Sequence, residues 1–127
     1  MTPEGRVKKH ITHVLSTFPS VYSFMPVQFG AGAAGLDYHC VVGKLFQFGI
    51  KIEMIPIAFF IEAKRPDAKP TDRQESFIAE RKSKQNARTF VIDEDPSLDR
   101  GNGLDELAQW LGEIERNNER LSAIFTR

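Results

Sequence analysis

Ala58-Phe59-Phe60-Ile61-Glu62-Ala63-Lys64 is the stretch of the 127-residue sequence that decides the fold. An apolar run that ends in charged residues predicts a buried β-strand. Successive side chains of a strand point to opposite faces, so Glu62 and Lys64 share one face while Ala63 lies on the other. Burial of an unpaired charge costs free energy. The two charges therefore indicate either a functional site or a strand end that is open to solvent.

The sequence on both sides of this strand divides into helical and strand-like segments by its apolar spacing. The expected elements are helices at 2–18, 71–86 and 104–125, and strands at 21–29, 36–42, 45–57 and 88–93. We expect a turn at Gly43 and Lys44, and a break at Pro56. This order predicts an α/β domain with a short mixed sheet flanked by helices. The strand 58–64, the helix 71–86 and the strand 88–93 should form a right-handed parallel crossover.

The length fits a single domain, 1–127, in which 96–127 form a C-terminal loop and a helical extension. The one cysteine, Cys40, excludes an internal disulfide and a multi-cysteine zinc site. Its apolar neighbours predict a buried, unreactive thiol. No apolar stretch approaches the roughly 20 residues that cross a bilayer, and no signal peptide begins the chain. We therefore expect a cytoplasmic protein without membrane contact.

The net charge of zero hides an uneven distribution of charge along the chain. Between Lys64 and Arg88 there are eight Lys or Arg against four Asp or Glu, whereas between Asp93 and Glu119 there are nine acids against two bases. The basic stretch is compatible with binding along a phosphate backbone, and also with a solvated helix face. Candidate phosphate contacts are Lys69, Arg73, Arg81, Lys82 and Lys84.

The expected C-terminal helix carries one apolar stripe with a single polar interruption at Asn118. The stripe consists of Leu104, Leu107, Leu111, Ile114, Leu121 and Phe125. Such a stripe predicts either a long helix that packs on its own domain or the seam of a dimer.

Asp37 follows a glycine-rich loop and begins another expected strand. If this strand neighbours the one that carries Glu62, the two carboxylates converge. They would repel each other unless a cation lies between them, and oxygen ligands suit Mg²⁺ or Mn²⁺. Lys64 could then orient a water molecule or stabilise charge on a phosphate, while the metal lowers the pKa of that water. These are the groups that hydrolysis of a phosphodiester requires.

Gly35-Leu36-Asp37 and Phe60-Ile61-Glu62-Ala63-Lys64 resemble the D…E-x-K signature of the PD-(D/E)XK nuclease superfamily. The sequence is most similar to the VRR-NUC branch, including its short stand-alone phage versions. Lys69-Pro70-Thr71-Asp72-Arg73-Gln74 resembles the loop and glutamine that follow in that branch, and Phe90-Val91-Ile92-Asp93 resembles its next strand. The resemblance covers roughly residues 4 to 95 and implies a restriction-endonuclease-like core. An extra stretch at 46–56 predicts a longer hairpin, a partner surface or a DNA-contacting element.

Several site residues are implied by the resemblance. Asp37 and Glu62 would be metal ligands together with the backbone carbonyl of Ala63, and Lys64 would be the catalytic lysine. Gln74 would face the site, although a capping box with Thr71 also accounts for it. Glu4 would complete the metal shell, although the helix dipole alone favours an acid there. His39 shares a strand face with Asp37, where either a structural histidine or a metal neighbour is compatible with the sequence.

The resemblance implies a Mg²⁺- or Mn²⁺-dependent DNA endonuclease without an organic cofactor, encoded by a phage and acting in the host cell. A homodimer would allow both strands to be cut, and enzymes of this branch that act on junctions and flaps imply a structure-selective substrate. Two alternatives stay open. One is a non-catalytic nucleic-acid-binding module on the same fold, and the other is an interaction protein that uses the acidic C-terminal helix.

Overall fold

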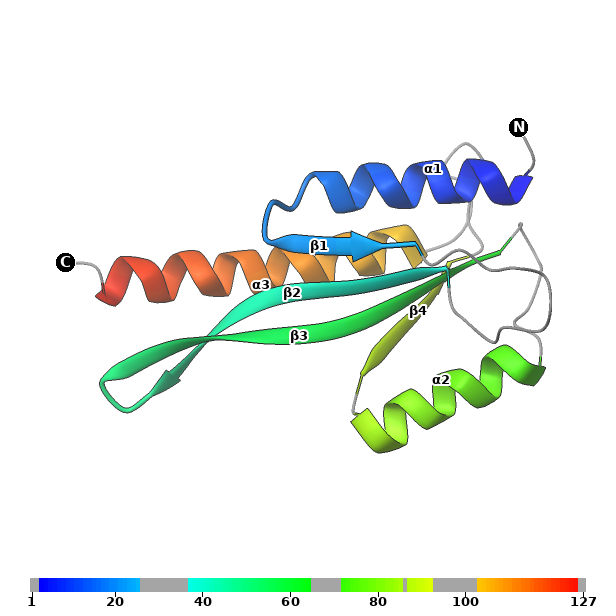
Figure 1. The fold of residues 1–127 in the computed structure, drawn as a ribbon. Helices are drawn as coiled ribbons and strands as arrows, with labels where there is room; N and C mark the ends of the chain where they lie inside the picture. Colours follow the sequence, from blue (N-terminus) through cyan, green and yellow to red (C-terminus); the bar gives the residue numbers. More distant parts are fainter. Residues whose placement is uncertain (1–2, 26–36, 65–71, 86, 93–102, 126–127) are drawn as a thin grey trace.

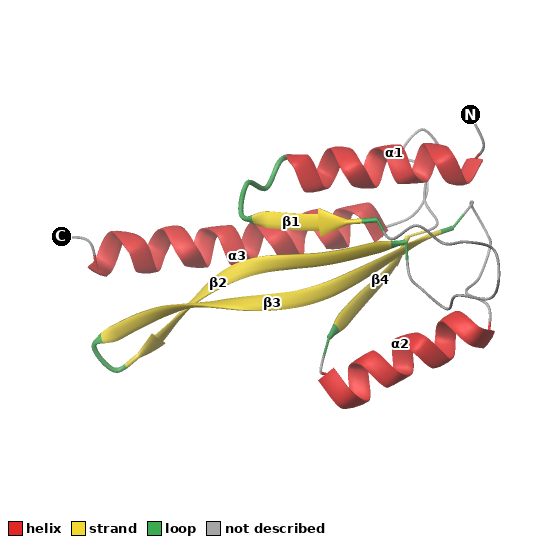
Figure 2. Cartoon of the chain, viewed as in Figure 1, coloured by secondary structure: helices red, strands yellow, loops and turns green. Residues whose placement is uncertain are grey.

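The computed structural model describes residues 3–25, 37–64, 72–85, 87–92 and 103–125. Their elements are α1 (Pro3–Ser16), β1 (Val21–Phe24), β2 (Tyr38–Phe48), β3 (Lys51–Ala63), α2 (Asp72–Gln85), β4 (Arg88–Ile92) and α3 (Gly103–Phe125). The four strands form one sheet in the order β1-β2-β3-β4 (Figure 2). The first two pairings are antiparallel, and β3 pairs with β4 in parallel. The α/β class, the mixed sheet and the parallel β3–α2–β4 unit are thereby confirmed.

The hydrophobic core lies between one face of the sheet and the helices α1 and α3. Apolar residues of α1, such as Val7 and Ile11, meet Phe59 and Ile61 of β3 and the buried leucines of α3. Helix α2 lies on the opposite face (Figure 1). There Ile78 packs against Phe60 and Ala87. Only the part of this second face near β4 is covered by α2.

The apolar stripe of α3 packs on the sheet of its own chain. Leu104, Leu107, Leu111 and Ile114 are buried in the core, and Leu121 is buried further along the helix. The first interpretation of this stripe is therefore confirmed, and its reading as a dimer seam is wrong. The helix has 23 residues, yet neither it nor another described helix combines the length and apolarity of a membrane span.

The turn expected at Gly43 and Lys44 is wrong, because both residues lie inside β2. The chain turns instead at Gly49 and Ile50, between the paired residues Phe48 and Lys51. Gly49 has a φ of 63°, a conformation that two-residue hairpin turns require and that glycine adopts without a steric penalty. The extra residues 46–56 are the outer half of a long β2–β3 hairpin, as one of the sequence alternatives predicted.

Pro56 does not interrupt β3, although proline lacks the N–H that a sheet ladder uses. It lies opposite Gly43, whose carbonyl accepts a hydrogen bond of 2.9 Å from Nδ2 of Asn118. That carbonyl therefore points away from β3, so Gly43 and Pro56 form a pair without ladder bonds. On the other side of β3, pairing with β4 starts only at Phe59. The missing N–H of Pro56 consequently leaves no ladder bond unmade.

Candidate active site

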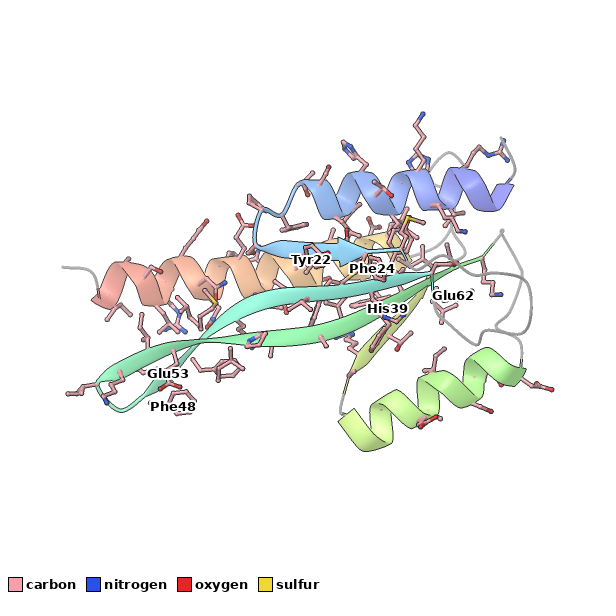
Figure 3. The ribbon with its side chains drawn as sticks, viewed as in Figure 1. Tyr22, Phe24, His39, Phe48, Glu53 and Glu62 are labelled. Atoms are coloured by element: carbon pink, nitrogen blue, oxygen red, sulfur yellow. The ribbon has the colours of Figure 1, made fainter. Side chains whose placement is uncertain are left out.

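Asp37 and Glu62 meet where β2 begins and β3 ends. The register pairs Tyr38 with Ile61, which brings the residues one step further along each strand opposite one another. The backbone N–H of Asp37 donates to Oε2 of Glu62 at 3.1 Å, and the N–H of Ala63 donates to Oδ2 of Asp37 at 2.8 Å. These reciprocal bonds fix both carboxylates. The expectation that the two strands are neighbours is confirmed, and Figure 3 labels Glu62 at this end of the sheet.

Two lysines flank the carboxylates. Nζ of Lys64 lies 3.5 Å from Oε1 of Glu62, and Nζ of Lys8 lies 3.5 Å from Oδ1 of Asp37. The backbone N–H of Lys64 donates to the carbonyl of Ile92 at 2.9 Å, which extends the β3–β4 pairing to the site. Each carboxylate thus has one ammonium group beside it, and both cations are placed to meet an anionic ligand.

Sequence reasoning missed Lys8 and the tyrosine that positions it. The hydroxyl of the buried Tyr38 donates to the backbone carbonyl of Lys8 at 3.0 Å. The same hydroxyl lies 3.0 Å from Oγ1 of Thr12, which can donate to it. Tyr38 thereby ties α1 to the residue that follows Asp37. Helical spacing could have indicated Lys8, because it lies one turn after Glu4, a predicted site residue, and so on the same face of the helix.

We expect Tyr38→Phe to lower the free energy of unfolding by about 1–2 kcal/mol, because a buried carbonyl and hydroxyl lose their partner. Equilibrium denaturation with urea would measure the loss. The matched control is Tyr22→Phe, which removes a hydroxyl from a largely exposed ring and should change stability by less than about 0.5 kcal/mol. Equal effects of the two substitutions would contradict the positioning role of Tyr38.

Glu62 is the one buried charged residue in the described part of the chain, with only 3% of its surface exposed. Burial, and then the neighbouring charge of Asp37, raise the pKa of its carboxyl to about 7. Lys64 and the amide of Asp37 lower the pKa, but less strongly. The raised pKa therefore has burial as its main cause, and raised carboxyl pKa values are common at functional sites.

The donor set fits a hard divalent cation. Each carboxylate oxygen has two lone pairs, so Asp37 and Glu62 retain acceptor capacity beyond their amide and lysine contacts. Mg²⁺ is often held by one or two carboxylates, with water and substrate phosphate as its other ligands. The described residues contain no cluster of three Asp, Glu, His or Cys side chains that could hold a metal. Further ligands would therefore come from the carbonyl of Ala63, from water or from Glu4, whose side chain is outside the described set.

The other predicted site residues are only partly described. Gln74, Arg73, Arg81 and Lys84 lie within α2, but their side chains are not described, and Lys69 lies outside the described ranges. Lys82 is exposed and lines a hollow with Ile78, Arg88 and Thr89, between α2 and β4. The ring of His39 packs edge-on between Phe24 and Phe60. Cys40 is buried in the core, and burial raises the pKa of its thiol to about 12, in agreement with an unreactive cysteine.

The arrangement of these elements occurs in a known fold. A solved structure described as a VRR_NUC domain superposes on this chain with a TM-score of 0.56 and 20% sequence identity. The match covers 86% of this chain and 97% of that one. No protein-family model matches the sequence, and neither does any curated protein. The chain therefore has the fold of a VRR_NUC domain.

Proposed function

We propose that this protein is a metal-dependent nuclease that hydrolyses phosphodiester bonds in DNA. The observation that carries the proposal is the meeting of two carboxylates, Asp37 and Glu62, where β2 begins and β3 ends. Each accepts a hydrogen bond from a backbone N–H of the other strand, and Lys64 lies beside Glu62. The similarity of the fold to a VRR_NUC domain supports it, as does the D…E-x-K pattern of the sequence, to which the three residues belong.

Each residue has a distinct role in this proposal. Asp37 and Glu62 hold Mg²⁺ or Mn²⁺, together with the carbonyl of Ala63 and with Glu4. The bound cation supplies a water of lowered pKa and polarises a phosphate oxygen. Lys64 would position the attacking water or stabilise the extra negative charge that develops on the non-bridging oxygens of the phosphate. Lys8, which contacts Asp37, keeps α1 against the site and adds a second positive charge for the phosphate.

Substrate contacts and assembly are further parts of the proposal. We assign contacts with the DNA backbone to polar and basic residues in and just before α2: Lys69, Arg73, Gln74, Arg81, Lys82 and Lys84. One small domain makes one cut, so cleavage of both strands of a branched substrate would need a homodimer. Such a dimer would use a surface other than the apolar stripe of α3, since the chain's own sheet covers that stripe.

The decisive test is cleavage of a panel of end-labelled DNA: a duplex, a flap, a four-way junction and a single strand, each with Mg²⁺, Mn²⁺ or EDTA. We expect metal-dependent cutting that Lys64→Ala reduces by about a hundredfold or more, because a charge that acts in the transition state is lost. Lys51→Ala is the matched control, since Lys51 is an exposed lysine at the start of β3. Undiminished cutting by Lys64→Ala would overturn the mechanism.

The rival from another class is a non-catalytic nucleic-acid-binding module on the same fold. The complete set of Asp37, Glu62 and Lys64 favours catalysis over it, since a binding module has no use for a buried glutamate whose pKa is raised beside a second carboxylate. Wild-type protein that binds the same DNA without cutting under any metal condition would establish the binding module instead.

A further inference from the structure

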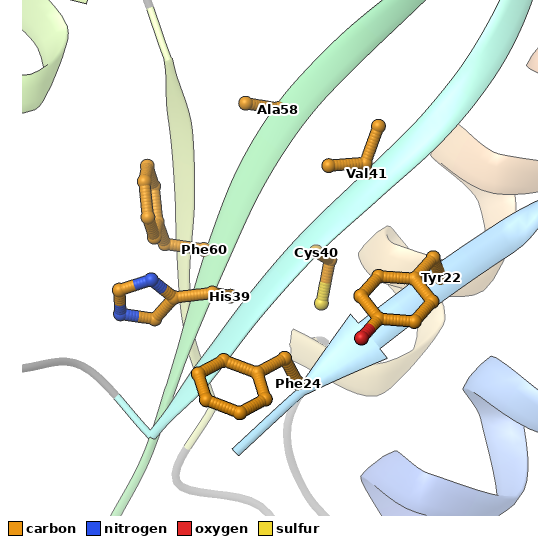
Figure 4. Close-up of a pocket in the computed structure, with 7 residues that line it drawn as sticks. All are labelled: Tyr22, Phe24, His39, Cys40, Val41, Ala58 and Phe60. Carbon is orange, nitrogen blue, oxygen red and sulfur yellow. The ribbon is translucent and has the colours of Figure 1, made fainter. Parts of the chain in front are cut away.

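The face of the sheet that carries the carboxylates also carries a row of aromatic rings. Phe24 of β1 lies opposite His39 of β2, and His39 lies opposite Phe60 of β3. The rings of Phe24 and His39 are 6.4 Å apart between centroids, and those of His39 and Phe60 are 5.0 Å apart, both in edge-to-face geometry. The three rings form one continuous row across three strands (Figure 4).

This aromatic row is the immediate neighbour of the acid pair. Side chains two apart on a strand share a face, so Phe60 lies on the same face of β3 as Glu62, and His39, which is opposite Phe60, lies on that face too. Two residues along a strand correspond to about 7 Å. If a nucleobase rests on the row, a phosphate at the carboxylates therefore belongs to the same nucleotide or to the adjacent one.

The row lines an open hollow of about 440 Å³, with Tyr22, Val41 and Ala58 on the same face. Neither α1 nor α3 covers this face, and α2 packs only at its β4 side. Tyr22 is 68% exposed and Phe24 is 52% exposed, an unusual position for two aromatic rings. Among the described residues, the lining holds no Asp, Glu, Lys or Arg. Such a surface suits an uncharged flat group and not a phosphate.

One end of this surface is cationic and the other is apolar, which matches the charged phosphate and the flat base of a nucleotide. Lys64 and Lys8 stand at the carboxylates, where they can meet a phosphate. The hollow begins one residue pair away and is lined mainly by aromatic rings and small apolar side chains. We propose that Tyr22 and Phe24 form a stacking platform for an unpaired nucleobase next to the scissile phosphate. This inference rests on the proposed nuclease function and names a specificity determinant for it.

A base inside a duplex is stacked on both faces by its neighbours, so the platform can receive only a base that is unpaired or extruded. Aromatic stacking tolerates every base, since each base has a π face. The platform therefore selects DNA that has unpaired nucleotides at the cut and does not select a base sequence.

The test separates binding from cutting. Full-length protein in EDTA is titrated against one labelled oligonucleotide, offered as a single strand and as a perfect duplex. We expect Tyr22→Ala and Phe24→Ala each to weaken single-strand binding about tenfold, and duplex binding by less than about twofold. Tyr22→Phe and Phe24→Tyr should restore single-strand binding, because they keep the ring. Ile124→Ala, which removes exposed apolar surface at the far end of α3, should leave both affinities unchanged.

A fluorescent base gives an independent readout. The emission of 2-aminopurine in the single strand should fall when wild-type protein binds, and should not fall with the Tyr22→Ala Phe24→Ala double variant. Single-strand binding that these substitutions leave intact, equal losses for single strand and duplex, or no single-strand binding by wild type would each overturn the platform. Cutting by wild type in Mg²⁺ is scored separately. Loss of the platform with intact cutting, or the converse, would show which of the two proposals fails.

Discussion

If the proposed nuclease function holds, Glu62→Gln will reduce cutting by about a thousandfold, because it removes a proposed metal ligand, and it will stabilise the metal-free protein. The gain in the free energy of unfolding should be about 3 kcal/mol near pH 8, since the pKa rises from 4.5 to about 7 and one pKa unit corresponds to about 1.4 kcal/mol. The reason is that Glu62 is held in a place that disfavours its charge. Burial and the charge of Asp37 outweigh the contribution of Lys64, so the pKa of Glu62 rises from 4.5 to about 7.

The sign of the pH dependence follows from that shift. Below pH 4.5 Glu62 is protonated in both the folded and the unfolded state, so the free-energy cost of its buried charge is absent. Between pH 4.5 and about 7 the folded state keeps a proton that the unfolded state has released, so stability falls as the pH rises. Above about pH 7 both states are ionised and the full cost is present. The advantage of Glu62→Gln over wild type should therefore grow across this window and then level off.

Thermal unfolding in EDTA and in Mg²⁺ gives the sharpest comparison. In EDTA at about pH 8 the variant should melt at the higher temperature. In Mg²⁺ only wild type should gain stability, because a ligand that binds the folded state shifts the unfolding equilibrium, and the difference should shrink or reverse. Glu53→Gln is the matched control, since Glu53 is an exposed acid of the β2–β3 hairpin (Figure 3). A Glu62→Gln protein that melts below wild type in EDTA at this pH would contradict the account of the site.

The candidate site was predictable from the sequence as far as alternation along one strand allows. Glu62 and Lys64 share a face because they are two residues apart, and this holds in any strand. The partner Asp37 needed a pairing between strands whose intervening hairpin is unusually long, and only the register shows that it lies opposite Glu62. Lys8 and Tyr38 could not be found in this way. Their contact joins residues 30 positions apart, and no local pattern encodes it.

The fold was predictable where one principle dominates and not where two compete. Apolar periodicity located the helices and most strands. Gly43 and Pro56 were read as breaks because glycine and proline usually punctuate secondary structure. In the folded chain the two residues lie opposite each other, at a pair that forms no ladder bonds. The context that tolerates them comes from Asn118 of α3, which is 75 residues away in sequence from Gly43.

Asn118→Leu will destabilise the protein more than its place on an apolar stripe suggests, by about 2–4 kcal/mol, because two buried backbone groups lose their partners. Oδ1 of Asn118 accepts a bond of 2.8 Å from the N–H of Leu45, and Nδ2 donates to the carbonyl of Gly43. Strand β1 pairs with β2 only as far as Val42. Beyond that point no strand among the described residues neighbours the edge of β2, and the side chain of Asn118 takes over the pairing. Leucine matches the stripe in polarity but cannot make either bond.

Urea denaturation measures the loss, and amide hydrogen exchange locates it. The amide of Leu45 should lose protection against exchange in Asn118→Leu. The amides of β3 that pair with β4 should still exchange only through global unfolding. Gln109→Leu is the matched control, because this exposed amide on the same helix contacts only the side chain of Glu113 in the described structure. It should change stability by less than about 0.5 kcal/mol. An Asn118→Leu protein as stable as wild type would mean that the edge of β2 finds other partners, and that the polar interruption is not what holds the long hairpin against α3.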